Sequence, residues 1–584
     1  MSHSAPSSEI DNGRGPKACT TCARAKVKCD ILPGSSICKR CLRLKKQCTA
    51  QTPGMHRRSK PDRISNDVTS LQPKSDGVAA ILAASETIGG PYISTPPSNS
   101  NAALLDPITC VQQFIKDDDE AALILDAYQT HMSLYFPFVA IPVRQTVHEL
   151  KQLKPFLFMV IMTVGCRHDV LRQTTLARKV REQISHKLLL NGEQNLDLLQ
   201  GLLVFIAWYH VQAGLGPQLS NLTHLAMALM IDLGLNKAIS PRGKTALGSM
   251  AYFRPPDRQS STERTLEERR AFLGVLYVTT AVSIWARDMD PVKYSRYADE
   301  CCRVLEQTNG YPSDEHLVVM IRIMSLCNRI RSTFSPEEWE PSSGMSAPVG
   351  VCVKSFEAEL EQLKTKLPTG TQSAEFLSLH YSFLQVFLYE VAVHDTIANT
   401  GYGAFPMTRL KMLFTCLDVV KQFFENFGTI SPAHYFNFTY FTWSLAGHVS
   451  VVLSKLCIFS GDGWDPNFAR STIDFPAMVD EMQAKLKEAA ALAEQSKLQT
   501  PQDRHSLPFS VPELFKMFTH TLRGWKESHM SRISQVGQQS QATMPTLSGT
   551  DDTLPTTAWD DEFLTSWEGN LFDFVDSNYW PQLT

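Results

Sequence analysis

Near the N-terminus, six of the fourteen cysteines fall within thirty residues and follow a repeated spacing. The half-unit C-x2-C-x6-C is written twice, and its members are Cys19, Cys22, Cys29, Cys38, Cys41 and Cys48. The chain begins MSHSAPSSEIDNGRG, which lacks the apolar run of a secretory signal, so we expect reduced thiols that bind metal rather than disulfides. Because thiolates favour Zn2+ and other thiophilic ions, the spacing predicts a zinc centre.

The number of thiolates limits how the metal is shared. Two tetrahedral zinc ions need eight ligand positions, which six cysteines cannot fill separately. Either two sulfur atoms bridge both ions, or one ion lacks a full set of ligands. Each C-x2-C pair can hold one ion, and the cysteine seven positions later returns to the same side of a two-turn helix. We expect two zinc ions per chain.

Positive charge surrounds the cysteines. From Arg14 to Arg63 there are fourteen Lys or Arg against two Asp, whereas the last thirty-four residues hold eight Asp or Glu and no Lys or Arg. Between Lys17 and Lys46 nine positive side chains accompany one carboxylate, Asp30, so the segment stays cationic after two Zn2+ and six thiolates add a charge of −2. The basic end favours a polyanionic partner, and the acidic end favours a different one.

The sequence CTTCARAKVKCD followed by ICKRCLRLKKQC resembles the fungal binuclear zinc-cluster (Zn2Cys6) DNA-binding domain, whose spacing it meets at all six cysteines. The resemblance implies that Cys19 and Cys38 bridge the two ions. It also implies that the short helix after Cys22 enters the major groove of double-stranded DNA at a CGG-like triplet. Ala23 and Ala25 stand where the family often has basic residues, so the base preference stays open.

The basic residues divide into two groups by the contacts we expect of them. Lys or Arg paired with guanine O6 and N7 discriminates between sequences, whereas a contact with phosphate only positions the domain. We assign Lys26, a base-contacting position in the family, and Arg24 to the bases. Phosphate contacts are assigned mainly to Lys17, Lys28, Lys39, Arg40, Arg43, Lys45 and Lys46. The alternative is that this run only solvates a small surface.

Composition divides the rest of the chain. We expect residues 1–16 to be disordered, 17–50 to form the DNA-binding module, and 51–103 to be a linker that is first basic and then rich in Ser and Pro. Helical spacing of apolar residues over 104–530 predicts a large all-α regulatory domain. Residues 531–584 are expected to be a polar linker and an acidic, disordered tail. The predicted fold class is therefore mainly α, with a small zinc module, a flexible linker, the helical domain and the tail.

Several segments carry the helical prediction. Phe475 to Ala493 has its apolar residues on one face, and Thr265-Leu266-Glu267-Glu268 has capping-box spacing before AFLGVLYVTTAVSIWA, which must lie inside a bundle. The charge-free stretch Leu198 to Ile231 contains a Gly216-Pro217 break, so we expect two buried helices and no membrane span. LILDAYQTHMSLYFPFVAIP also resembles the start of the family's regulatory domain, which implies a sensed ligand or partner but identifies neither.

The end of the chain mixes acidic and aromatic side chains. The aromatic residues of this candidate activation segment are Trp559, Phe563, Trp567, Phe572 and Phe574. Acidic charge keeps such rings in solvent until a coactivator groove binds them, so we expect transcription coactivators as partners. The alternative is a helix that docks back on the core.

These features together predict a sequence-specific DNA-binding transcription regulator, with an activator of RNA polymerase II genes favoured. The basic run His56-Arg57-Arg58-Ser59-Lys60 is a candidate nuclear-import patch or DNA-backbone arm, and we expect a nuclear protein. No G-x-S-x-G, phosphate-loop, G-x-G-x-x-G or H-E-x-x-H motif occurs, so we expect no enzyme. A repressor with a folded-back tail, or a helical metabolite receptor or enzyme with an accessory zinc cluster, is the alternative. The short apolar stripe Ile64, Val68 and Leu71 leaves a homodimer open.

Overall fold

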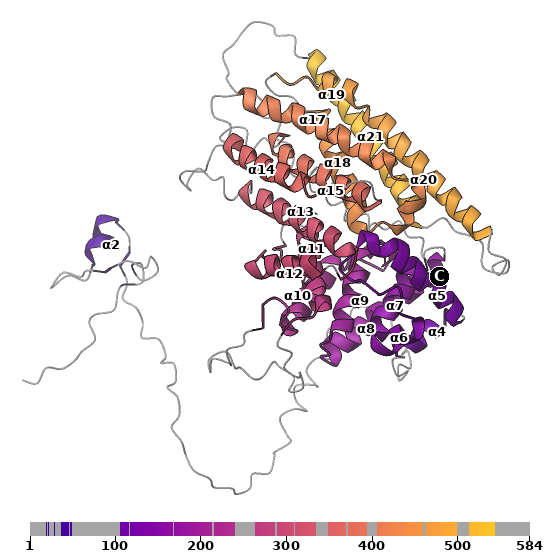
Figure 1. Cartoon of the computed structure of the whole chain (residues 1–584). Helices are drawn as coiled ribbons and strands as arrows, with labels where there is room; N and C mark the ends of the chain where they lie inside the picture. The colour runs from indigo at the N-terminus through magenta and orange to yellow at the C-terminus, as the bar shows by residue number, and fades with distance from the viewer. Residues whose placement is uncertain are drawn as a thin grey trace, which may run out of the picture. The chain divides into compact units, whose positions relative to one another are not determined.

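The computed structural model divides the chain into two compact units, Met1–Ser98 and Asn99–Thr584. It describes residues 19, 22, 28–29, 37–45 and 47–48 of the first unit, and 106–115, 117–166, 169–212, 215–239, 263–285, 289–308, 310–334, 349–368, 372–393, 406–459, 463–498 and 513–542 of the second. Every regular element of these residues is a helix, which confirms the mainly α fold class (Figure 1). The predicted disordered N-terminus, the linker and the acidic segment lie outside the described residues.

The first helices of the second unit pack around α7 and α9. They are α4 Pro107–Gln112, α5 Asp118–Ala127, η1 Tyr128–Met132, η2 Ser133–Tyr135, α6 Val147–Leu153, α7 Pro155–Gly165, α8 Val170–Ile184, η3 Ser185–Leu190, α9 Leu196–Ala207, η4 Tyr209–Gln212 and α10 Leu219–Asp232. The start of α7 is capped from α9, because the N–H groups of Phe156 and Leu157 donate to the Asp197 carboxylate at 3.0 and 2.8 Å. A Cβ at Gly201 of α9 would collide with the Phe156 ring, so glycine allows the two helices to approach closely.

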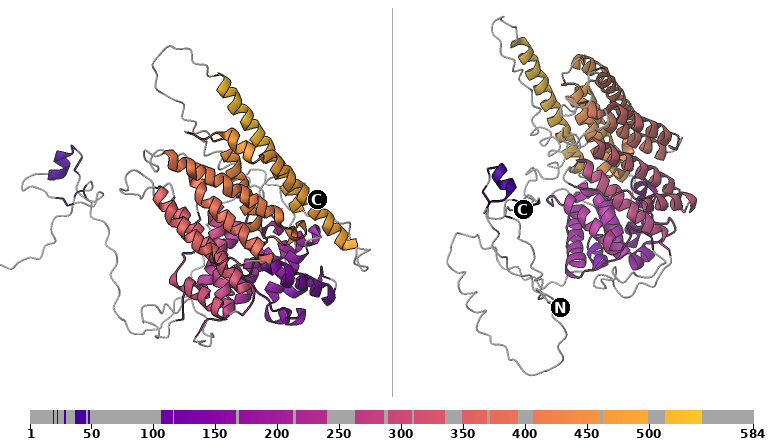
Figure 2. Two further views of the ribbon diagram at one scale, coloured as in Figure 1. Left: turned by 45° about the horizontal axis from the view of Figure 1, so that its top comes forward. Right: turned by 90° about the vertical axis from the view of Figure 1, so that its left-hand side faces the viewer.

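The later helices extend the core along the molecule. They are α11 Leu266–Trp285, α12 Arg296–Thr308, α13 Ser313–Thr333, α14 Val349–Lys364, α15 Gln372–Tyr389, η6 Glu390–Val393, α17 Pro406–Thr429, η7 Pro432–Asn437, α18 Tyr440–Leu456, α19 Pro466–Thr472, α20 Phe475–Leu498 and α21 Glu513–Ala542. Neighbours in sequence are largely neighbours in space, with α13, α15, α17 and α18 in succession (Figure 1). The long α21 runs along one edge of this group (Figure 2).

The helix expected inside the bundle is α11. Its capping box is present, since the N–H of Thr265 donates to Glu268 Oε2 at 3.0 Å and the N–H of Glu268 donates to Thr265 Oγ1 at 3.1 Å. Every residue from Arg269 to Trp285 is buried. The Arg270 guanidinium is neutralised there by Asp314 of α13, through bonds of 2.6 and 2.9 Å. The prediction that this segment lies inside a bundle is therefore confirmed.

The charge-free stretch forms two helices, α9 and α10, as expected. Gly216 (φ +79°) makes the turn before α10, and the Arg181 guanidinium donates to the carbonyl oxygens of Leu215 and Gly216. Among the described residues, Ser373–Val393 is long and apolar enough to cross a membrane, but 83% of that window is buried by other helices. Such burial is the pattern of a core helix.

The last two helices agree with the sequence prediction except at the C-terminal end of α21. As predicted, α20 begins at Phe475 and buries Phe475, Val479 and Leu486. The expected polar linker begins at residue 531, whereas α21 continues to Ala542. Residues 531–542 contain Arg, Gln, Ser and Ala but no proline, so a helix already docked at its first half can propagate through them.

Candidate metal centre and nucleic-acid interface

The first unit gathers its cysteine sulfur atoms at one centre. The Sγ atoms of Cys19, Cys22, Cys38 and Cys41 all lie within 4.8 Å of one another, and these side chains are buried. Cys29 and Cys48, which are half-buried, pack against this group. The folded chain thus brings together the six cysteines that the sequence singled out.

The distances between sulfur atoms suit tetrahedral zinc. A Zn–S bond of about 2.3 Å gives a tetrahedron whose sulfur-to-sulfur edge is about 3.8 Å. The Sγ atom of Cys38 lies 3.9 Å from that of Cys19 and 3.6 Å from that of Cys22. The Sγ atoms of Cys19 and Cys41 are 3.7 Å apart. In both spacing and donor chemistry, the centre fits zinc.

The backbone around the centre repeats at an offset of nineteen residues. In each half, the N–H of the first cysteine donates to the third sulfur, and the N–H of the second cysteine donates to the first sulfur. The four bonds, each 3.4 Å long, run from Cys19 to Cys29, Cys22 to Cys19, Cys38 to Cys48 and Cys41 to Cys38. The described cysteines of the two halves therefore make the same backbone contacts around the metal centre.

These N–H donors also control the acidity of the thiols. The N–H of Cys41 stabilises the thiolate of Cys38 and lowers its pKa to about 6. The N–H of Cys22 likewise lowers the pKa of Cys19. Burial instead raises the pKa of Cys22 to about 12 and also raises the pKa of Cys41. The first cysteine of each half is thus the more stable thiolate, and a bound cation would favour the thiolate form at every ligand.

The second half continues into α2, Lys39–Arg43, with Cys38 as its N-cap. Lys45 follows in the left-handed region (φ +50°) and turns the chain toward Cys48. The described residues among those assigned to phosphate are all exposed or half-buried: Lys28, Lys39, Arg40, Arg43 and Lys45. Lys17, Arg24, Lys26 and Lys46, together with the run from His56 to Lys60 and all five aromatic residues of the activation segment, lie outside the described residues.

Three apolar side chains of the module had no assigned role. Ile37, Leu42 and Leu44 are 40%, 62% and 43% exposed. Nineteen residues earlier, the first half has alanine at each matching position, Ala18, Ala23 and Ala25. Aligning the sequences of the two halves would have shown this difference. The first half has small side chains at the positions where the second half has bulky ones.

Seven of the eight remaining cysteines are buried in the helical unit, among them the adjacent Cys301 and Cys302, and Cys352 is half-buried. Within the part of the chain that the structure describes, the cluster of Cys19, Cys22, Cys38 and Cys41 is the one group of His, Cys, Asp or Glu placed to hold a metal ion.

Two known family models match the helical unit. The family model described as the WAR1 C-terminal domain matches residues 99–432, more than half of the chain, and a second model, described as a C-terminal domain, matches residues 432–569. The boundary at residue 432 coincides with the start of η7. The helical unit therefore carries two matched family domains in succession.

Curated relatives are similar over most of their length. "Transcription factor opdL" of Penicillium oxalicum is 30% identical over 486 residues, 80% of this chain and 83% of the relative. "Transcription factor himD" of Aspergillus japonicus is 26% identical over 76% of this chain and 74% of the relative. A "Transcription factor" of Aspergillus terreus is 23% identical over 67% and 60%. These relatives are transcription factors rather than enzymes, and the chain belongs to the family of fungal transcription factors with a WAR1 C-terminal domain, as a DNA-binding regulator of transcription.

Proposed function

We propose that this regulator is a nuclear, sequence-specific activator whose N-terminal module holds two zinc ions in six thiolates. The observation that carries the zinc proposal is the set of sulfur-to-sulfur distances, 3.6 to 3.9 Å, beside the tetrahedral edge of about 3.8 Å. Bound zinc would fix the fold of the module by tying its two halves together. Such a small unit has little other apolar core.

The contacts between halves support Cys19 and Cys38 as the shared ligands. The three sulfur-to-sulfur distances of 3.6 to 3.9 Å that join the halves each include one of these two residues. One ion would be held by Cys19, Cys22, Cys29 and Cys38, and the other by Cys38, Cys41, Cys48 and Cys19. Two shared sulfurs let six thiolates fill the eight positions of two tetrahedra.

The difference between the halves supports the first half as the base-reading one. A helix that enters the major groove brings its backbone close to base edges, which small side chains such as Ala23 and Ala25 permit. Leu42 and Leu44 would stand in the way at the matching positions of the second half. We therefore place Lys26 and Arg24 against bases, and the exposed Lys and Arg of the second half against phosphates.

Selection from random double-stranded oligonucleotides by the zinc-loaded chain tests the DNA proposal. We expect enrichment of CGG-like triplets, and loss of that enrichment when a chelator removes the metal. Lys26→Ala should flatten the preference, whereas Lys39→Ala should weaken binding to all sites alike. Equal loss of specificity in both variants would contradict the assignment, and unchanged selection after metal removal would contradict the zinc module.

We place activation in the acidic-aromatic segment and regulation in the helical unit, which would respond to an effector or partner. Fusing residues 551–584 to an unrelated DNA-binding domain should raise reporter transcription, while a fusion with the five aromatic residues changed to alanine should not. A silent or repressive wild-type fusion would favour a repressor. Sedimentation of the zinc-loaded chain would decide between a monomer and a homodimer.

A further inference from the structure

Four exposed apolar side chains gather on α14, α17 and α19 of the helical unit. They are Val351, Met407, Phe414 and Phe468, which are 59%, 71%, 38% and 47% exposed. Large apolar side chains are scattered singly over most protein surfaces, whereas a group of them marks a contact with another segment or molecule. We call these four residues the α17–α19 surface.

Contacts beneath this surface join its members across the three helices. The rings of Phe414 and Phe468 lie 5.4 Å apart, and Phe414 also packs on the buried ring of Trp464 at 5.1 Å. The first turn of α14 meets the first turn of α17, where a Cβ at Gly350 would lie 3.1 Å from the Thr408 side chain. Because α17 takes part in both contacts, the four side chains belong to one face.

Positively charged side chains stand around the α17–α19 surface. Lys354 of α14 and Lys411 of α17 are exposed, and neither makes an ion pair in the part of the chain that the structure describes. Arg470 of α19 donates to a carbonyl oxygen and to an amide oxygen. Of the acidic residues on the same helices, Asp465 is occupied in capping α19, and Asp418 lies further along α17. The surface therefore suits a partner that combines apolar side chains with negative charge.

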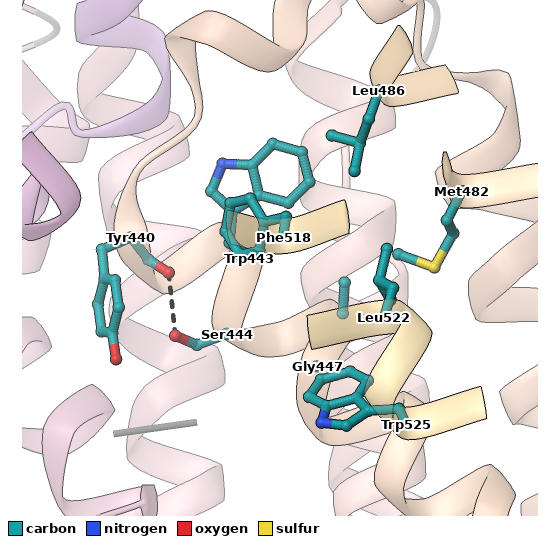
Figure 3. Close-up of a pocket in the computed structure, with 10 residues that line it drawn as sticks. Tyr440, Trp443, Ser444, Gly447, Met482, Leu486, Phe518, Leu522 and Trp525 are labelled. Carbon is teal, nitrogen blue, oxygen red and sulfur yellow. Dashed lines mark hydrogen bonds between the residues drawn. The ribbon is translucent and has the colours of Figure 1, made fainter. Parts of the chain in front are cut away.

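The last described helix, α21, runs toward this surface. Its apolar side chains, Trp525 among them, hold it against α18 and α20 (Figure 3). Lys526 pairs with Asp480 of α20, and the ring of His529 lies 4.4 Å from that of Phe475, the first residue of α20, so the two helices are antiparallel. Beyond His529, α21 therefore passes the start of α20, which α19 precedes by two residues. In Figure 1 the C-terminal end of α21 lies at the same end of the unit as α19.

The acidic-aromatic segment is within reach from this point. Sixteen residues separate Ala542, the end of α21, from Trp559, the first aromatic residue of the segment. This stretch of chain spans at most about 60 Å, and the tether keeps the segment at a high local concentration. The segment alternates aromatic rings with acidic side chains and holds no Lys or Arg, so it matches the surface in both respects. A second copy of the α17–α19 surface would instead bring lysine against lysine.

We propose that residues 551–584 dock on the α17–α19 surface of their own chain and are released when a coactivator binds them. The aromatic rings cover the exposed apolar side chains, and the acidic side chains face Lys354 and Lys411. The proposal rests on the activation role proposed for this segment and supplies the means by which the helical unit regulates it. A coactivator must then compete with the chain's own surface for the same rings.

Photochemical cross-linking in the zinc-loaded full chain tests the contact, with p-benzoylphenylalanine in place of Phe468. Mixing isotope-labelled and unlabelled chains separates cross-links within a chain from those between copies. We expect cross-links from this position to residues 551–584 of the same chain. Leu190, 75% exposed at the end of η3, is the matched control position and should give none. No cross-link to the segment, equal yields from the two positions, or cross-links only between copies would overturn the proposal.

Reversing one charge tests the electrostatic part of the contact. Lys411→Glu places a carboxylate beside the exposed apolar side chains and should lower the cross-link yield from position 468 about threefold or more. Lys237→Glu changes another exposed lysine, after α10, and should leave the yield unchanged. Equal yields in the two variants would contradict docking by an acidic segment.

Reporter transcription by the full chain links the contact to regulation. It should rise about threefold in Lys411→Glu and not in Lys237→Glu, because the released segment is open to coactivators. A lost cross-link without this rise, in a chain whose isolated segment activates, would contradict the masking. Cross-linking requires no transcription, so a silent fusion of residues 551–584 would end the activation proposal and leave the docking test intact.

Discussion

Removing the negative charge of Asp314 is expected to destabilise the WAR1 C-terminal domain strongly. Asp314 is 1% exposed and receives two bonds from Arg270, which is 2% exposed, and a third of 3.1 Å from the N–H of Tyr311. Asp314→Asn keeps the size of the side chain but leaves the Arg270 charge buried without a counter-ion. Breaking a buried pair in this way costs about 3 to 5 kcal/mol of unfolding free energy.

The chain offers a matched control in Arg329 and Glu359. This pair is also joined by two hydrogen bonds, but its side chains are 53% and 35% exposed. Glu359→Gln should therefore cost only about 0 to 1 kcal/mol. Urea unfolding of the helical unit, followed by far-ultraviolet circular dichroism, compares the two variants under identical conditions. Equal shifts of the urea midpoint would refute the argument from burial.

A double replacement separates lost charge balance from lost packing. In Arg270→Met with Asp314→Leu, no charge remains buried and most of the apolar volume is kept. Such replacements of buried pairs are often neutral or stabilising. We expect the double variant to recover most of the stability lost in Asp314→Asn. A double variant that is less stable than Asp314→Asn would show that the pair itself is a net source of stability.

Three further predictions concern the DNA module and the helical unit. Lys45→Gly and Lys45→Ala both remove a phosphate contact. Fluorescence anisotropy across salt concentrations should therefore show weaker DNA binding and a salt slope reduced by about 1 for each variant. The glycine variant should be more stable than the alanine variant by about 1 kcal/mol, because Lys45 has φ +50°. A different effect of the two variants on the salt slope would contradict the phosphate role. Burial lowers the pKa of His529 from 6.5 to about 4, so the unfolded form binds the proton first as the pH falls. Docking of α21 should therefore be complete above about pH 6.5 and weaken as the pH falls toward 4. Hydrogen exchange of α21, corrected for intrinsic rates, should lose this pH dependence in His529→Gln. Thr265→Ala should cost about 1 kcal/mol in thermal unfolding and Thr265→Ser much less, since serine keeps the capping oxygen; equal losses would count against the capping box.

The sequence predicted the features that depend on local spacing. The pattern of Cys19, Cys22 and Cys29 and its repeat indicate one centre, because short segments leave few ways to bring six sulfur atoms together. Likewise, Thr265 and Glu268 predict the start of α11 from a pattern only a few residues long. These features come from interactions between near neighbours, and a pattern in the chain can specify them.

Features built from distant segments could not be predicted in this way. The carboxylate of Asp197 caps a helix that begins about forty residues earlier, and Arg270 meets Asp314 across forty-four residues. The apolar interface that contains Trp443 and Trp525 depends on how three helices pack. In sequence each of these aromatic residues is only an apolar position on a helix. The end of α21 was also missed, because residues after Met530 are polar and form a helix as its continuation.

The account depends most on two metal ions that share Cys19 and Cys38. Reconstitution of the chain with an NMR-active cadmium isotope gives the most direct measurement, since each cadmium couples to the β-protons of its own cysteine ligands. We predict two cadmium signals per chain, with the β-protons of Cys19 and Cys38 coupled to both and those of the other four cysteines coupled to one. A single signal, or two signals with no cysteine coupled to both, would contradict the shared centre.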